Sequence, residues 1–210
     1  MTDVNGVATS AAPYTLVDIN NEILELFNQG KINDLRNALS LQIQGSSVII
    51  PNKIPAALAA IIFSVAFDTA LEVVIKVEKN KSFRIFNHHG EFTVLDDSPV
   101  IDNEACVELK KIIEKTLSIS DMAGAQPVFS LNIEELWKQA IASNFSFDKS
   151  VMLFIDSITK LREPAHRLFL SGEVEALPVF LTLYLTRPLS QHIYFVNDAG
   201  KEFIIFSKNQ

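Results

Sequence analysis

An apolar run followed directly by a strict alternation constrains the fold of this chain more than any other feature of the sequence. The run covers residues 55–67, well short of the ~20 residues that span a bilayer, and is typical of a buried helix. After it, apolar residues recur at every second position, at Leu71, Val73, Ile75 and Val77. A period of two predicts a strand with one solvent-facing side, so helix and sheet must pack together here.

The flanking residues extend this pattern into an α+β unit. Helix-period spacing predicts helices over residues 19–27 and 32–41. Asp18 is placed to cap the N-terminus of the first helix, and Gly30 is placed to end it. A short strand is expected at 48–50, and residues 71–77, 83–86 and 91–95 form a predicted three-stranded antiparallel meander. A further helix is predicted over 104–117, where Cys106 lies on the apolar stripe.

The pattern of helices followed by strands begins again after residues 118–127, a stretch of mostly small and polar residues. Asn132 and Glu135 form a capping-box-like start to one helix, and Asp148 opens the next. We expect a helical stretch at 164–170, then three strands at 179–185, 193–196 and 203–206. Asn197 to Gly200 provide the turn between the last two.

The sequence therefore predicts an α+β fold, with helices packed on antiparallel three-stranded meanders and two similar α+β halves. Residues 86–95 resemble residues 196–205, which supports the similarity of the halves. The predicted divisions are a disordered tail at 1–14, a first half at 15–118, a linker at 119–127 and a second half at 128–210.

Charge and composition narrow the classes of partner. A net charge of -7 without a cluster of lysine and arginine argues against nucleic acid, whose binders neutralise phosphates. The N-terminus has neither the basic nor the apolar part of a signal peptide, and no direct membrane insertion is expected. The single cysteine, Cys106, excludes an internal disulfide, and these features together favour a cytoplasmic protein.

Motifs for catalysis are weak. The seven glycines form no phosphate-binding spacing, and no serine lies in a G-x-S-x-G sequence. His88 and His89, with Asp96, Asp97 or Asp102, are the best candidates for a metal or acid–base site, but they match no zinc pattern and are simply explained as turn residues. We therefore predict no catalytic residue, no metal and no cofactor.

An aromatic and hydroxylated face offers a more specific hypothesis. If residues 179–186 form a strand, Val179, Leu181, Leu183 and Leu185 face the core. The other face then carries Phe180 and Tyr184, joined by Tyr194 of the next strand. Such a face is either covered by the chain's own helices or offered to a partner, because interface cores are rich in aromatic residues.

The predicted function is that of a non-enzymatic, intracellular adaptor or chaperone-like subunit that binds another protein through Phe180, Tyr184 and Tyr194. In its size, acidity and α+β composition the chain is similar to the chaperones and adaptors of bacterial secretion systems, a likeness that implies a role in holding another protein. Two alternatives stay open. One is an enzyme with a site assembled around His88, His89 and Asp96, and the other is a structural protein that associates with its own copy.

Overall fold

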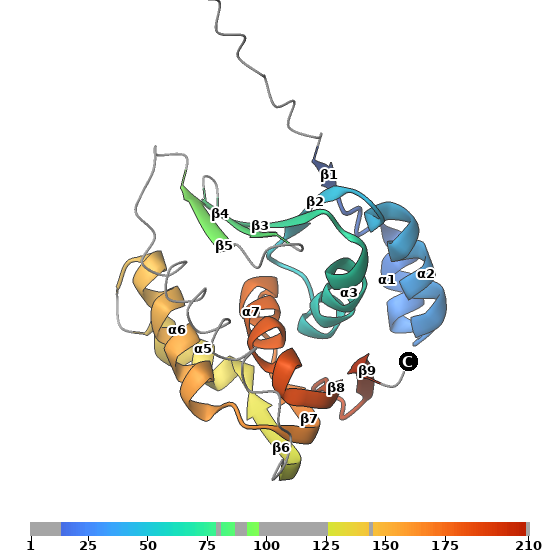
Figure 1. Cartoon of the computed structure of the whole chain (residues 1–210). Coiled ribbons are helices and arrows are strands. Elements are labelled where there is room, and N and C mark those ends of the chain that lie inside the picture. Colours follow the sequence, from blue (N-terminus) through green and yellow to red (C-terminus); the bar gives the residue numbers. More distant parts are fainter. Residues whose placement is uncertain (1–13, 79–80, 87–91, 97–125, 143–144, 209–210) are drawn as a thin grey trace, which may run out of the picture.

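Two mixed sheets enclose a pair of apolar helices in the computed structural model. The structure describes residues 14–78, 81–86, 92–96, 126–142 and 145–208. Helices α3 (Ala56–Thr69) and α7 (Ala176–Thr186) lie side by side between the sheets, as Figure 1 shows. The α+β class predicted from the sequence is confirmed.

The first half contains a five-stranded sheet of order β1-β2-β3-β4-β5. Strands β1 (Thr15–Leu16), β2 (Ser47–Pro51) and β3 (Glu72–Glu78) are parallel, and β4 (Lys81–Phe86) and β5 (Phe92–Asp96) continue antiparallel. Helices α1 (Asn21–Asn28) and α2 (Ile32–Ile43) connect β1 to β2. The predicted meander of β3, β4 and β5 is confirmed, but the cap of α1 is Asn20 and not Asp18, since Asn20 Oδ1 accepts from the Ile23 N–H at 3.0 Å.

The second half contains a four-stranded sheet of order β6-β7-β8-β9. Strands β6 (Gln126–Asn132), β7 (Ala165–Ser171) and β8 (Ser190–Val196) are parallel, and β9 (Glu202–Ser207) pairs antiparallel with β8. Helices α5 (Ile133–Ile141) and α6 (Phe147–Leu161) connect β6 to β7, and a short 3-10 turn, Arg187–Leu189, follows α7. The capping role of Asn132 is confirmed, because its Oδ1 accepts from the Glu135 N–H at 3.2 Å.

Both halves repeat one order of elements, β-α-α-β-α-β-β, to which the first half adds β5. The registers also agree. Ser47 of β2 lies opposite Glu72 of β3, and Ala165 of β7 lies opposite Ser190 of β8, so 25 residues separate the parallel partners in each half. This shared topology supports the predicted similarity of the two halves.

Two predicted elements were wrong, and the sheets are mixed where antiparallel meanders were expected. Residues 179–185, predicted as a strand, belong to helix α7, and residues 164–170, predicted as helical, form most of strand β7. An apolar segment buried on all sides shows no helical period, so its pattern did not distinguish helix from strand. Because β7 supplies the strand beside β8, only β8 and β9 of the predicted second meander are antiparallel neighbours.

The remaining predicted boundaries fall largely outside the described residues. They are the tail at 1–14, of which Tyr14 alone is described, the helix at 104–117 with Cys106, and residues 119–125 of the predicted linker. The last two residues predicted as linker, Gln126 and Pro127, belong to strand β6.

The core is continuous across the two halves and centres on α3 and α7. Every residue of α7 except Tyr184 is buried, and so are ten of the residues of α3. The hydroxyls of Thr182 and Thr186 are satisfied within α7, since they donate to carbonyls four residues earlier at 2.8 and 2.7 Å. Helix α3 also contacts β8 and β9, and α7 contacts β3. Each central helix therefore packs on the sheet of the other half.

Asn52 links the start of α3 to the start of α7. Its side chain is 3% exposed. Its Oδ1 accepts from the Leu177 N–H at 2.9 Å, its carbonyl accepts from the Ala176 N–H at 2.8 Å, and its Nδ2 donates to Glu175 Oε2 at 2.8 Å. The first N–H groups of a helix have no partner inside the helix. Asn52 therefore caps α7 from the other half of the chain.

Replacing Asn52 tests this cap. Asn52→Ala should lower the free energy of unfolding by about 2–3 kcal/mol, because the Leu177 N–H stays buried without its acceptor. Asn52→Asp keeps an acceptor but brings a second carboxylate to Glu175, so its penalty should grow as pH rises from about 4 to about 7. Urea unfolding over that range measures both, and a cost below about 0.5 kcal/mol for both variants would contradict the cap.

Gly172 makes a second tight contact, at the junction of β7 and α5. Its φ of 107° lies in the region that favours glycine. A Cβ at this position would lie 2.6 Å from Glu134 Cβ and 2.8 Å from Asn132 Oδ1. Asn132 caps α5 and Glu134 lies in its first turn, so the chain has no room for a side chain here.

Gly172→Ala should therefore cost more than a backbone penalty alone. Gly45→Ala is the matched control, because Gly45 also has a positive φ, 65°, but nothing lies within 4 Å of its added Cβ. We expect about 1–2 kcal/mol for Gly45→Ala, and a further ~1–3 kcal/mol for Gly172→Ala from the clash. Equal losses in chemical denaturation would contradict the close contact.

Candidate functional site

The three predicted partner-binding residues do not share one surface. Phe180 is 1% exposed, and its ring meets Phe63 of α3 edge-to-face at 5.1 Å. Tyr184, one helical turn later, is half-buried with its ring 6.0 Å from that of Phe67. Tyr194 lies on β8, half-buried and stacked on Phe169 at 5.0 Å. Phe180 thus belongs to the packing between α3 and α7, not to an exposed face.

Tyr194 belongs to the outer side of the second sheet. Its neighbours Ile193 and Phe195 are fully buried, so the alternation of the strand turns Tyr194 away from the helices. Val128 and Ile204, on β6 and β9, are 52% and 48% exposed. Tyr194 and Phe169 therefore lie together on the outer side of the second sheet, apart from Phe180 and Tyr184.

Two histidines also lie on the second sheet. The rings of His166 and His192 meet edge-to-face at 5.1 Å, and His192 Nδ1 lies 2.9 Å from Ser207 Oγ. The two residues are 26 positions apart in the chain, and the parallel pairing of β7 with β8 brings them together. The contact between the rings explains the position of His166, and the same contact together with the Ser207 hydroxyl explains that of His192, so neither requires a functional role.

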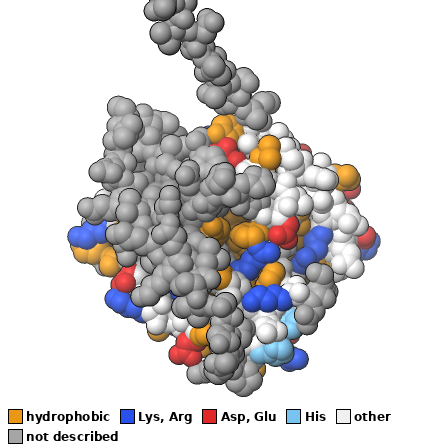
Figure 2. All heavy atoms as spheres, in the orientation of Figure 1, with side chains coloured by type: hydrophobic (Ala, Val, Ile, Leu, Met, Phe, Trp, Pro, Cys, Tyr) orange, Lys and Arg blue, Asp and Glu red, His pale blue; other side chains and the backbone are white. Residues whose placement is uncertain are grey.

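A groove of about 430 Å³ lies between the two halves, where α3 faces β9. Its first wall is five consecutive residues, Ile204 to Lys208, which cover the end of β9 and the residue after it. Its second wall is formed by four residues from the C-terminal part of α3, Phe63, Ser64, Phe67 and Asp68. Figure 2 shows apolar side chains with lysine and arginine side chains beside them where these elements meet. The volume falls in the range typical of ligand pockets.

One end of the groove is closed by Arg187, which follows α7. Its guanidinium lies 3.6 Å from the ring centre of Phe67 and 4.5 Å from that of Phe206. It also donates to Asp68 Oδ1 at 3.2 Å. Burial lowers the pKa of Arg187, an effect that the Asp68 carboxylate opposes. Burial also raises the pKa of the neighbouring Tyr184 phenol, which the charge of Arg187 partly offsets.

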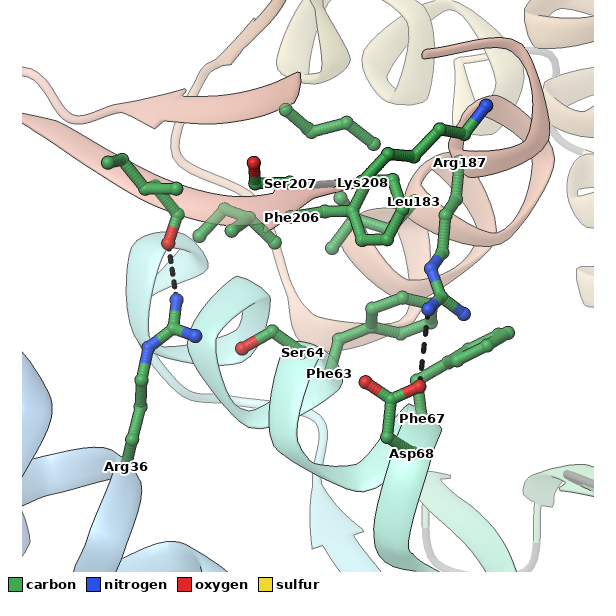
Figure 3. A pocket seen from close by; sticks show the side chains of 13 residues that line it. Arg36, Phe63, Ser64, Phe67, Asp68, Leu183, Arg187, Phe206, Ser207 and Lys208 are labelled. Carbon is green, nitrogen blue, oxygen red and sulfur yellow. Dashed lines mark hydrogen bonds and ion pairs between the residues drawn. The ribbon is translucent and has the colours of Figure 1, made fainter. Parts of the chain in front are cut away.

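Arg36 of α2 stands at the other end, as Figure 3 shows. Its guanidinium donates to the backbone carbonyl of Ile204 on β9. Burial lowers the pKa of Arg36, and within the described part of the chain no carboxylate pairs with it. Arg36 is thus a partly desolvated cation that donates to a neutral acceptor.

The charge around the groove differs from that of the whole chain. Three cations, Arg36, Arg187 and Lys208, line it with one described carboxylate, Asp68. The chain itself carries a net charge of -7. The groove therefore concentrates positive charge on an acidic protein and would favour an anionic ligand.

Sequence reasoning did not identify this groove. Its residues come from α2, α3, β8, β9 and the end of α7, and no local pattern joins them. Phe67 and Arg187 are 120 positions apart in the chain and meet because α3 and α7 lie side by side. In the sequence, each of these residues stands at the end of a long, mostly apolar segment, but this shared feature does not reveal that the two segments pair.

The predicted metal or acid–base candidates lie largely outside the described residues. This applies to His88, His89, Asp97 and Asp102, and to the side chain of Asp96, the last residue of β5. In the described ranges no three histidine, cysteine, aspartate or glutamate side chains are placed to hold a metal ion. Among the same residues, no helix combines the length and apolar character needed to cross a bilayer.

Comparison with protein-family models, with curated proteins and with solved structures finds no match to this chain.

The stack around Arg187 gives a test of the groove's construction. Arg187→Lys keeps the charge opposite Asp68 but loses the planar contact with Phe67 and Phe206, so it should cost about 1 kcal/mol of unfolding free energy. Asp68→Asn should cost less than about 0.5 kcal/mol, since the Asp68 side chain is 67% exposed. Urea unfolding of both variants measures the two losses of unfolding free energy. A larger loss for Asp68→Asn than for Arg187→Lys would contradict the stabilising role of the stack.

Proposed function

We propose that this protein is a non-enzymatic adaptor that binds a segment of another protein in the groove between α3 and β9. The observation that carries the proposal is the composition of the groove walls. One wall is the edge strand of a sheet, and the other is lined by the half-buried ring of Phe67 and the buried ring of Phe63.

An edge strand can pair with an extended peptide, because its outward N–H and C=O groups have no neighbouring strand. β9 stands at the end of the described order of the second sheet. The wall from Ile204 to Lys208 spans about 16 Å at ~3.3 Å per residue, enough for a short extended segment. Pairing along β9 would supply affinity that does not depend on the partner's sequence.

The opposite wall would supply selectivity. Aromatic and arginine side chains are enriched at the centres of protein interfaces. Here Phe67, Arg187 and Phe206 are stacked before any partner arrives, so little side-chain freedom remains to be lost on binding. This preorganisation favours recognition of one apolar side chain of the bound segment.

Site-specific photo-crosslinking in the native host cell tests the proposal. A benzophenone amino acid replaces Lys208, an exposed residue on the groove, or Lys160, an exposed control on α6. We expect a covalent adduct with a second protein from position 208 and none from 160. Ser64→Phe, which fills the groove from α3, should abolish the adduct.

The adduct mass distinguishes the remaining outcomes. An adduct of twice the chain mass would replace the adaptor with the self-associating alternative. Equal adducts from both positions, no adduct, or an adduct that survives Ser64→Phe would contradict the groove as the binding site.

A further inference from the structure

We infer that the segment bound in the groove is acidic, and that Arg36 receives one of its carboxylates. This inference rests on the proposed function and adds the chemistry of the partner. It starts from the difference between the two arginines at the ends of the groove.

Arg187 shows how this groove holds a carboxylate. Its guanidinium is stacked beside Phe67 and Phe206 and donates to Asp68 at 3.2 Å. The aromatic rings exclude water from one side of the cation, and the carboxylate neutralises its charge. At this end of the groove, a partly buried arginine thus already has an anionic partner.

Arg36 has no such partner among the described residues. It donates to the Ile204 carbonyl, which is neutral, and burial already lowers its pKa. A guanidinium has five N–H donors arranged to hold a carboxylate through two parallel bonds. Arg36 therefore retains donors that can bind an anion while one still contacts Ile204, and a carboxylate would offset the cost of its desolvation.

Lys208 extends the positive charge along β9. It lines the groove, is exposed, and its Nζ lies 3.5 Å from the Pro188 carbonyl oxygen, a neutral acceptor. The apolar surface of Phe63 and Phe67 lies on the α3 side. A complementary segment carries an apolar or aromatic side chain with acidic residues close to it in sequence. A uniformly acidic segment would leave the apolar surface of Phe63 and Phe67 without a contact, and a neutral segment would leave Arg36 without an anionic partner.

Fluorescence anisotropy with three labelled peptides tests this chemistry. The first contains the sequence Glu-Val-Phe-Val-Glu, and the others replace both glutamates with glutamine or with lysine. We expect the full-length protein to bind the glutamate peptide at least about tenfold tighter than the glutamine peptide, because one charge-assisted pair contributes that much. The lysine peptide should bind more weakly than both.

Two arginine variants separate a specific role of Arg36 from a general loss of charge or stability. Arg36→Gln should reduce the preference for glutamate over glutamine to about twofold or less. Arg162→Gln is the matched control, since the Arg162 guanidinium also donates to a backbone carbonyl, that of Leu185 at 2.7 Å, and burial also lowers its pKa. Arg162 lies outside the groove lining, so this variant should keep the preference.

The outcomes distinguish this inference from the proposed function. Equal binding of the glutamate and glutamine peptides, both abolished by Ser64→Phe, would overturn the acidic preference and leave the groove as a peptide site. A preference that survives Arg36→Gln would overturn the role of Arg36. Failure of all three peptides to bind would contradict both the acidic preference and the peptide-binding groove.

Discussion

The packing of α3 against α7 is the interaction on which the rest of the structure depends. Both helices are apolar on almost every side, so neither can be covered by its own sheet alone. Each contacts a strand of the other half, and Asn52 caps α7 across the boundary. The two similar halves are therefore joined by their cores, and the boundary between them is the interior of one folded unit.

This packing also creates the groove. Where α3 ends, Ser64, Phe67 and Asp68 emerge from the buried region and face β9 of the other half. Where α7 ends, Arg187 emerges beside them and is held between Phe67 and Phe206. Arg36 reaches the same strand from α2. A site whose walls come from both halves exists because the central helices bring those walls together, and buried contacts lie beneath it.

The sequence predicted the first half better than the second, for a physical reason. The alternation from Leu71 to Val77 and the turn signals beyond it are local, and they correctly predicted β3 and its meander. The expected solvent-facing side of β3 was wrong in part, because Glu72 and Val74 on that side are buried and Leu71 is 45% exposed. Segment 176–186 is buried on all sides, so its apolar residues carry no period, and Pro178 in its first turn is compatible with a helix. The error removed Phe180 and Tyr184 from the predicted face, while Tyr194 stayed on the outer side of the sheet. The groove depends on contacts between residues far apart in the chain, such as Phe67 with Arg187, which periodicity cannot supply.

Native-state hydrogen exchange tests most directly the claim that the joined core holds the groove in place. If α3 and α7 form one cooperative unit, their central amides, such as those of Ile62 and Leu181, should exchange with the same free energy of opening at every urea concentration below the unfolding transition. The amide of Phe195 in β8, beside the edge strand, should exchange with them. A lower free energy of opening for the β8 and α7 amides than for those of α3 would show that the second half opens by itself. The groove would then not be a preformed site, and the claim that the joined core holds its walls together would be wrong.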